Sequence, residues 1–75
     1  MALKEERVIA RIPRDEDNEL KVITGMFWNK RVIDIRWWNN GKPTKKGIRI
    51  NEKEIEPLRS AVEMIRIGIE ERNEN

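Results

Sequence analysis

The most informative stretch of the chain is residues 32–48, which read VIDIRWWNNGKPTKKGI. An apolar run with one arginine, Arg36, ends here in two adjacent tryptophans, Trp37 and Trp38, and a lysine-rich segment follows. Its alternation of apolar and polar residues predicts a β-strand that enters a basic loop. Aromatic rings and mobile positive charges therefore share one short part of the chain.

This combination suits a single-stranded nucleic acid, because unpaired bases can stack on aromatic rings and lysines can contact the phosphates. Residues 30–50 hold seven lysines and arginines against one acid, for a net charge of +6, whereas residues 1–29 carry −1 and residues 51–75 carry −3. A net charge of only +2 thus conceals a strongly basic middle, as expected for a localised anion-binding surface. A solvated loop that happens to be basic is the alternative interpretation.

Length and composition narrow the classes of protein that fit. The 75 residues predict a single domain over residues 1–75, and a chain this short buries only about 60% of the surface that it exposes when unfolded. The sequence contains neither cysteine nor histidine, so disulfides and most transition-metal sites are excluded and a homodimer is the expected source of further core. We expect no cofactor and no enzymatic activity, because the sequence offers no thiolate or imidazole as nucleophile or general base. Asp34 is the one acid in the basic segment, and it is best interpreted as a charge partner for nearby arginines.

The chain also lacks a sequence signal for a membrane. No apolar run approaches the roughly 20 residues of a membrane span, and residues 1–6 have no apolar core of a signal peptide. We therefore expect an intracellular protein without a membrane partner.

Hydrophobic periodicity predicts an α+β fold. Strands are expected at about residues 7–12, 20–28, 31–38 and 47–51, in a curved four-stranded antiparallel sheet. Asn29–Lys30 is the expected tight turn between the second and third strands. In the first strand, Val8, Ala10 and Ile12 are expected to alternate with Arg7, Ile9 and Arg11.

The same alternation sorts side chains onto two faces of the sheet. The predicted core face includes Leu20, Val22, Met26, Ile33, Ile35, Trp37, Ile48 and Ile50. The opposite face is expected to hold cations and two aromatic residues: Arg11, Lys21, Phe27, Arg36, Trp38 and Arg49. Large rings exposed among charges usually mark a contact surface. The alternative is that Phe27 and Trp38 lie beneath a loop or in a dimer contact.

A long C-terminal helix is predicted at about residues 53–72. Its apolar residues cover an arc of about 180°, which is wider than one packing surface needs. We expect one side of the helix to pack on the sheet of its own chain and the other to pack on the same helix of a second copy. The expected dimer interface is Leu58, Ala61, Val62, Met64, Ile65 and Ile69. Asn51 and Glu54 fit a capping box, and Pro57 favours a helix that starts later.

Two motifs in this order resemble a known family. Ile33-Asp34-Ile35-Arg36 closes the third strand and Lys42-Pro43-Thr44-Lys45-Lys46-Gly47-Ile48 opens the fourth, which resembles the single-stranded-DNA-binding domain of the transcriptional coactivator positive cofactor four family, including its small bacterial and phage members. The resemblance covers residues 20–69. It implies a homodimer held by its helices that binds single-stranded DNA largely independently of sequence, in transcription or in DNA replication and repair, with contacts to that machinery.

The resemblance also implies roles for individual residues. The family's strand-three arginine falls on Arg36, its hairpin cation on Lys30, and its hairpin aromatic on Phe27, or on Trp28 if the turn shifts. In the family an acidic residue separates the arginine from the aromatic pair, whereas Trp37 directly follows Arg36 here. The alternation of side chains along the strand favours Trp38 for the nucleic-acid face and Trp37 for the core. The predicted nucleic-acid-binding residues are Lys21, Phe27, Trp28, Lys30, Arg36, Trp37, Trp38, Lys42, Lys45, Lys46 and Arg49.

Two alternatives to single-stranded DNA remain open in the sequence. Single-stranded RNA would use the same stacking and phosphate contacts, since no residue visibly tests for a 2′-hydroxyl. A protein-interaction dimer would instead use the aromatic residues to bind a protein surface.

Overall fold

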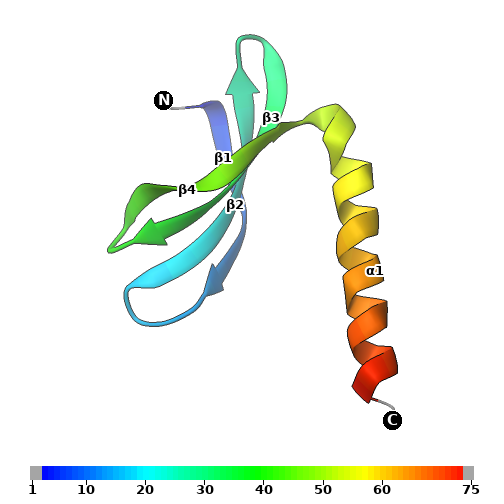
Figure 1. Cartoon of the computed structure of the whole chain (residues 1–75). Helices are drawn as coiled ribbons and strands as arrows, with labels where there is room; N and C mark the ends of the chain where they lie inside the picture. Colours follow the sequence, from blue (N-terminus) through cyan, green and yellow to red (C-terminus); the bar gives the residue numbers. More distant parts are fainter. Residues whose placement is uncertain (1–2, 74–75) are drawn as a thin grey trace.

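The computed structural model describes residues 3–73. Four strands form one antiparallel sheet in the order β1–β2–β3–β4, and a single helix follows them (Figure 1). The elements are β1 (Lys4–Pro13), β2 (Asn18–Phe27), β3 (Lys30–Asn39), β4 (Lys42–Asn51), the short 3-10 helix η1 (Glu52–Glu54) and α1 (Ile55–Asn73). The predicted α+β order of four strands and one helix is confirmed. Residues 1–2 and 74–75 of the predicted domain lie outside the described residues.

Two-residue turns connect β2 to β3 and β3 to β4. Both residues of each turn have positive φ: Trp28 (53°) and Asn29 (61°) in the first, Asn40 (50°) and Gly41 (77°) in the second. Such turns match the twist of the strands that they join. The expected turn at Asn29–Lys30 is wrong by one residue, because Lys30 already pairs with Phe27 in the sheet.

The prediction that the lysine-rich segment forms a loop before the fourth strand is also wrong, because β4 begins at Lys42. Asn39 pairs with Lys42 and Trp38 pairs with Pro43, so the chain reverses within the two residues of the turn and pairs with β3 again at once. The three lysines of this segment, Lys42, Lys45 and Lys46, therefore lie on an edge strand. Lysines on a sheet edge also discourage pairing with another chain.

Residues 44–46 form a bulge in β4. Arg36 lies opposite Gly47, yet Trp38 lies opposite Pro43, so three residues of β4 face Trp37 alone. The two strands approach closely at the end of this bulge: a Cβ on Gly47 would lie 2.6 Å from the carbonyl oxygen of Ile35. Only glycine fits there without a shift of the backbone.

The register confirms which side chains share each face of the sheet, but the prediction that the apolar set forms the core of the chain is wrong, because none of its eight members is buried. Paired residues share a face, and the register places on one of them the set that we call the apolar face: Leu20, Val22, Met26, Ile33, Ile35, Trp37, Ile48 and Ile50. The other, which we call the charged face, carries Arg11, Lys21, Phe27, Arg36, Trp38 and Arg49.

The expected alternation in β1 holds only from Ala10 onward. Val8 pairs with Ile23 and Ala10 pairs with Val22, so Ile9 is an extra residue in a bulge. The bulge places Val8 opposite Ile23 of the charged face, whereas Ala10 lies on the apolar face.

The junction between sheet and helix forms as the sequence predicts. The side chain of Asn51 accepts a hydrogen bond from the Lys53 amide (3.0 Å), and the Glu54 carboxylate accepts one from the Asn51 amide (2.9 Å), which completes the capping box. The α-helix starts later, at Ile55, with Pro57 in its first turn. A proline is tolerated there because first-turn amides have no partner within the helix.

Helix α1 does not cover the sheet of its own chain, contrary to expectation. Figure 1 shows it beside the sheet, and within the described residues the element that it mainly contacts is the adjacent η1. The capped turn at η1 leads the helix away, so the apolar face stays open and Ile48 remains 51% exposed. The buried apolar residues Leu3, Ile23 and Val32 instead form a small cluster on the charged face, with Phe27 and Trp38 against it.

Replacing Gly47 with alanine should destabilise the β3–β4 hairpin. The new Cβ would meet the backbone of Ile35 and Arg36, so we expect the free energy of unfolding to fall by about 2 kcal/mol, as for an overpacked site. Denaturant unfolding followed by far-UV circular dichroism, at one protein concentration, measures this change. Gly41→Asn is the control in the same hairpin: asparagine tolerates positive φ and nothing lies within 4 Å, so the loss should stay below about 1 kcal/mol. Equal losses in both variants would contradict the close approach at Gly47.

Candidate nucleic-acid interface

The charged face is hollowed around the middle of the sheet. A groove of about 840 Å³ opens there, and it is lined by Leu3, Glu6, Ile23, Asp34, Arg36, Trp38, Pro43, Thr44, Lys45 and Arg49. Its cations come from β3 and β4, and its apolar floor comes from the small buried cluster. The strand pairing itself brings these side chains together, because Arg49 lies opposite Asp34 and Gly47 leaves room opposite Arg36.

Asp34 is the centre of the polar contacts in this groove. Its residue surface is only 5% exposed, and its carboxylate accepts hydrogen bonds from Arg36 Nε (3.1 Å) and Nη2 (3.0 Å). Arg49 Nε lies 3.5 Å from the same carboxylate. The predicted role of Asp34 as a partner of nearby arginines is confirmed. The hydrogen bond to Asp34 raises the pKa of Arg36, so this arginine stays charged.

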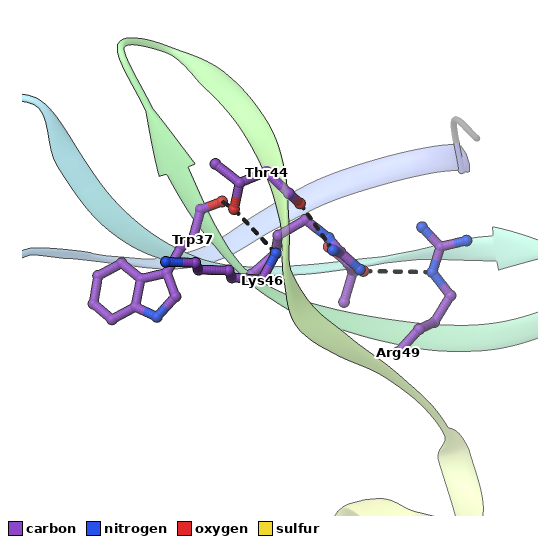
Figure 2. A network of polar contacts seen from close by, with 6 residues as sticks. Trp37, Thr44, Lys46 and Arg49 are labelled. Carbon is purple, nitrogen blue, oxygen red and sulfur yellow. Dashed lines mark hydrogen bonds and ion pairs between the residues drawn. The ribbon is translucent and has the colours of Figure 1, made fainter.

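Arg36 also holds the bulge of β4. Its Nη1 donates a hydrogen bond to the carbonyl oxygen of Thr44 (2.9 Å). The hydroxyl of Thr44 donates to the carbonyl oxygen of Trp37 (2.7 Å) and accepts from the amide of Lys46 (3.2 Å). Figure 2 shows this network, with Arg49 at one end and Lys46 with Trp37 at the other. A chain of polar contacts therefore runs from a buried carboxylate to the backbone of the lysine-rich bulge.

The two aromatic rings of the charged face are partly occupied by cations. Lys21 Nζ lies 3.8 Å from the centre of the Trp38 ring, and Arg49 Cζ lies 5.4 Å from the centre of the Phe27 ring. Trp38 also packs against the buried cluster, and its Nε1 is buried without an acceptor among the described residues. A base could stack on Trp38 only after Lys21 moves.

Trp28 is different, because its ring is open to solvent. The residue is 83% exposed at the tip of the β2–β3 turn, where its ring centre lies 6.0 Å from that of Phe27. Its backbone has φ of 53°, a conformation that is unfavourable for a bulky residue. A strained, exposed aromatic residue is typical of a contact site rather than of a structural turn.

Trp37 lies away from the other predicted aromatic residues. The register places it on the apolar face, and Arg14 Cζ lies 3.9 Å from the centre of its ring. The prediction from strand alternation that Trp38 and Trp37 lie on opposite faces, with Trp38 on the charged face, is thus confirmed. Trp37 consequently lines no groove with Arg36 and Trp38.

The predicted lysines are spread over the sheet. Lys45 lines the groove beside Arg36 and Arg49, whereas Lys30 lies next to the exposed Trp28–Asn29 turn and Lys42 at the start of β4. Lys46 is exposed on the bulge. The structure brings Lys21, Arg36, Trp38, Lys45 and Arg49 close to one groove and sets Phe27, Trp28 and Lys30 at one hairpin.

One acid partly neutralises the charged face at the β1–β2 side. Glu19 forms ion pairs with Arg11 (3.0 Å) and Lys21 (3.6 Å). The hydrogen bond from Arg11 lowers the pKa of Glu19, and the same bond raises the pKa of Arg11. Glu19 therefore remains negative near neutral pH and competes with phosphates for these cations.

Sequence reasoning missed several residues that line this groove, Thr44 and Leu3 among them. Thr44 organises the bulge, but a lone threonine between a proline and two lysines gives no signal until the register is known. Leu3 reaches the groove from the start of the described chain, and in the sequence it directly precedes the charged run Lys4-Glu5-Glu6-Arg7 and belongs to no repeating apolar pattern.

Several other kinds of site find no support in the part of the chain that the structure describes. From residue 3 to residue 73, acidic residues do not gather into a group that could hold a metal ion. Within those limits α1 is also too polar to be a membrane-crossing helix.

Comparison of the chain with protein-family models, with curated proteins and with solved structures found no match. The resemblance to the positive cofactor four family therefore stays a prediction that rests on the two motifs.

The strain at Trp28 can be measured. Trp28→Asn should raise the free energy of unfolding by about 1 kcal/mol, because asparagine adopts the left-handed conformation more readily. Denaturant unfolding followed by far-UV circular dichroism reports this change. Asn29→Ala in the same turn should act in the opposite direction, since alanine is less suited to a φ of 61°. Destabilisation by Trp28→Asn would show that the ring stabilises the hairpin.

Proposed function

We propose that this protein binds single-stranded DNA through the charged face of its sheet and catalyses no reaction. One observation carries the proposal: a groove lined by Arg36, Lys45 and Arg49 lies on the face of the sheet that also holds aromatic rings. In addition, Trp28 is exposed in the β2–β3 hairpin. Cations beside stacking surfaces are what a flexible single strand requires. Binding of this kind is largely independent of sequence, which fits a role in transcription or in replication and repair.

The lysines supply the electrostatic part of this binding. Lys45 at the groove, and Lys30 and Lys42 at the two hairpins, are exposed and can reach phosphates. Each neutralised phosphate of a single strand releases counterions, which contributes about 0.7 to the slope of log affinity against log salt. Arg36 has a different part, because its guanidinium already holds Asp34 and Thr44.

Aromatic stacking supplies the preference for single strands. Trp28 offers an open ring, and a base stacked on such a ring adds roughly 1–3 kcal/mol with little sequence preference. A duplex keeps its bases paired, so it can use only the charges. Single-stranded RNA offers the same ring faces and phosphates, so the relative affinity for RNA has to be measured.

The protein is proposed to act as a homodimer. Helix α1 does not cover the apolar face of the sheet, and it carries its own apolar stripe, in which Leu58 is half-buried and the other residues are exposed: Ile55, Leu58, Val62, Ile65 and Ile69. Their spacing of three and four residues is the seam of a two-helix contact. Val62 is 57% exposed and Ile65 is 62% exposed, and exposed apolar surfaces of this extent mark association sites. Ala61 and Met64 extend this seam on one side, where they can cover the apolar face of a sheet.

If α1 forms the dimer interface, a charge in its apolar stripe should prevent association. Ile65→Asp places a charge in the seam and should convert a dimer into monomers of 9.0 kDa, with a loss of thermal stability. Size-exclusion chromatography with light scattering measures the mass. Ser60→Asp is the matched control, because Ser60 is exposed on the opposite side of the helix and its replacement should leave the mass unchanged. A monomeric wild-type chain would contradict the dimer.

The proposed binding mechanism predicts different salt dependence for a lysine variant and a tryptophan variant. Lys45→Ala should weaken binding of every single strand and flatten the salt slope by about 0.7, because one phosphate contact is lost. Trp28→Asn should weaken binding by about 1–3 kcal/mol with the slope kept, because only stacking is lost. Fluorescence anisotropy of a labelled oligonucleotide at several salt concentrations measures both quantities.

A charge control completes this test. Arg59→Ala also removes one positive charge, but Arg59 lies on α1 and pairs with Glu56, so the slope should stay as in the wild type. Identical slopes for Lys45→Ala and Trp28→Asn would contradict the assignment of these two residues.

A further inference from the structure

We infer that Asp34 is a positioning residue: it holds Arg36 in place and, through Thr44, fixes the β4 bulge that carries Lys45 into the groove. The inference deepens the proposed function and rests on it. Asp34 itself has the wrong charge to contact a phosphate, so any contribution to binding has to pass through its neighbours.

The first step is the pairing of Asp34 with Arg36. The carboxylate is 5% exposed, and a buried charge of this kind needs hydrogen-bonded partners. Arg36 supplies two of them, from Nε (3.1 Å) and Nη2 (3.0 Å). Two parallel bonds fix the plane of the guanidinium as well as its position. Arg36 is therefore oriented before any ligand arrives.

The second step is the link from Arg36 to the bulge. With its plane fixed by Asp34, Arg36 directs Nη1 at the carbonyl oxygen of Thr44 (2.9 Å). That carbonyl belongs to the segment where the pairing with β3 is interrupted, so strand pairing does not hold it. The arginine thus replaces a missing ladder contact at the bulge.

The third step is the closure of the bulge by Thr44. Its hydroxyl bridges the Trp37 carbonyl oxygen (2.7 Å) and the Lys46 amide (3.2 Å), which joins β3 to both ends of the irregular segment. Lys45 lies between these two anchored residues of β4 and lines the groove. The position of Lys45 consequently depends on contacts that begin at Asp34.

This chain of contacts predicts an effect opposite to that of charge alone. Asp34→Asn removes a negative charge from a face that is proposed to bind phosphates, so simple electrostatics predicts tighter binding. If Asp34 positions the site, the same substitution loosens Arg36 and the bulge and should weaken the affinity for a single-stranded DNA oligonucleotide by about tenfold. The sign of the change therefore distinguishes the two accounts.

Glu19→Gln is the matched control. It removes a second negative charge from the charged face, but Glu19 contacts Arg11 and Lys21 and takes no part in the bulge. Electrostatics alone governs this variant, so the affinity should increase, by less than about threefold. Weaker binding by both variants would overturn the specific role of Asp34.

A pair of variants at Thr44 tests the same route without changing any charge. Thr44→Val keeps the shape but removes the hydroxyl and should weaken binding by about tenfold, whereas Thr44→Ser keeps the hydroxyl and should bind within about threefold of the wild type. The double variant of Asp34→Asn with Thr44→Val should bind no more weakly than the weaker single variant, because both act through one network. Additive losses would overturn the proposed route. If Asp34→Asn fails to fold, the contrast between valine and serine at Thr44 decides alone.

A measurement without ligand separates this inference from the proposed function. The backbone amide of Lys46 donates to Thr44, so its proton chemical shift in a ¹⁵N-correlated NMR spectrum reports the bulge. We expect this chemical shift to change in the Asp34→Asn variant without DNA and to remain as in the wild type in the Glu19→Gln variant without DNA. Two results would overturn this inference but not the proposed function. One is an unchanged Lys46 amide shift in Asp34→Asn. The other is a wild type that binds single-stranded DNA together with an Asp34→Asn variant that binds it equally tightly. A wild type that binds no single strand would overturn the proposed function and the inference with it, although the NMR shift would still show whether Asp34 holds the bulge.

Discussion

The contact between the buried Asp34 carboxylate and its arginines is the interaction on which the charged face depends. A carboxylate that is 5% exposed must be paired, and Arg36 and Arg49 meet this requirement from β3 and β4. Strand register places both cations on one side of the sheet, and the ion pairs with Asp34 orient them there and leave Arg36 Nη1 available to hold Thr44 across an irregular stretch of β4. One acid in a basic segment thus orients the two arginines beside it.

The two faces of the sheet have different requirements. The charged face contains the small buried cluster and is complete within one chain, whereas the apolar face is open because α1 turns away at η1. A second copy would cover the apolar face and leave the charged face free for a ligand. Proposed dimerisation and proposed binding therefore use separate surfaces, and the strained Trp28 lies in the turn that joins β2 to β3.

Much of this architecture could be predicted from the sequence, because alternation along strands fixes which side chains share a face. The sorting of Lys21, Arg36 and Trp38 to one face, the role of Asp34 and the capping box at Asn51 all follow from local patterns. Other features depend on contacts that no local pattern encodes. Tryptophan has no preference for a left-handed turn, the β4 bulge requires Thr44 to meet Trp37, and the width of an apolar arc does not reveal which chain covers it.

The account is tested most directly by titrating the intrinsic fluorescence of the wild-type protein with mixed-sequence single-stranded DNA, its RNA counterpart and the DNA duplex, at low and moderate salt. The exposed Trp28 reports contact with a base directly. The account predicts strong quenching by single strands, weaker quenching by the duplex, and a loss of affinity as salt rises. The ratio of the DNA and RNA affinities then identifies the preferred strand. No response to any of these ligands at low salt would contradict nucleic-acid binding and leave a protein-interaction dimer as the explanation of the exposed aromatic residue.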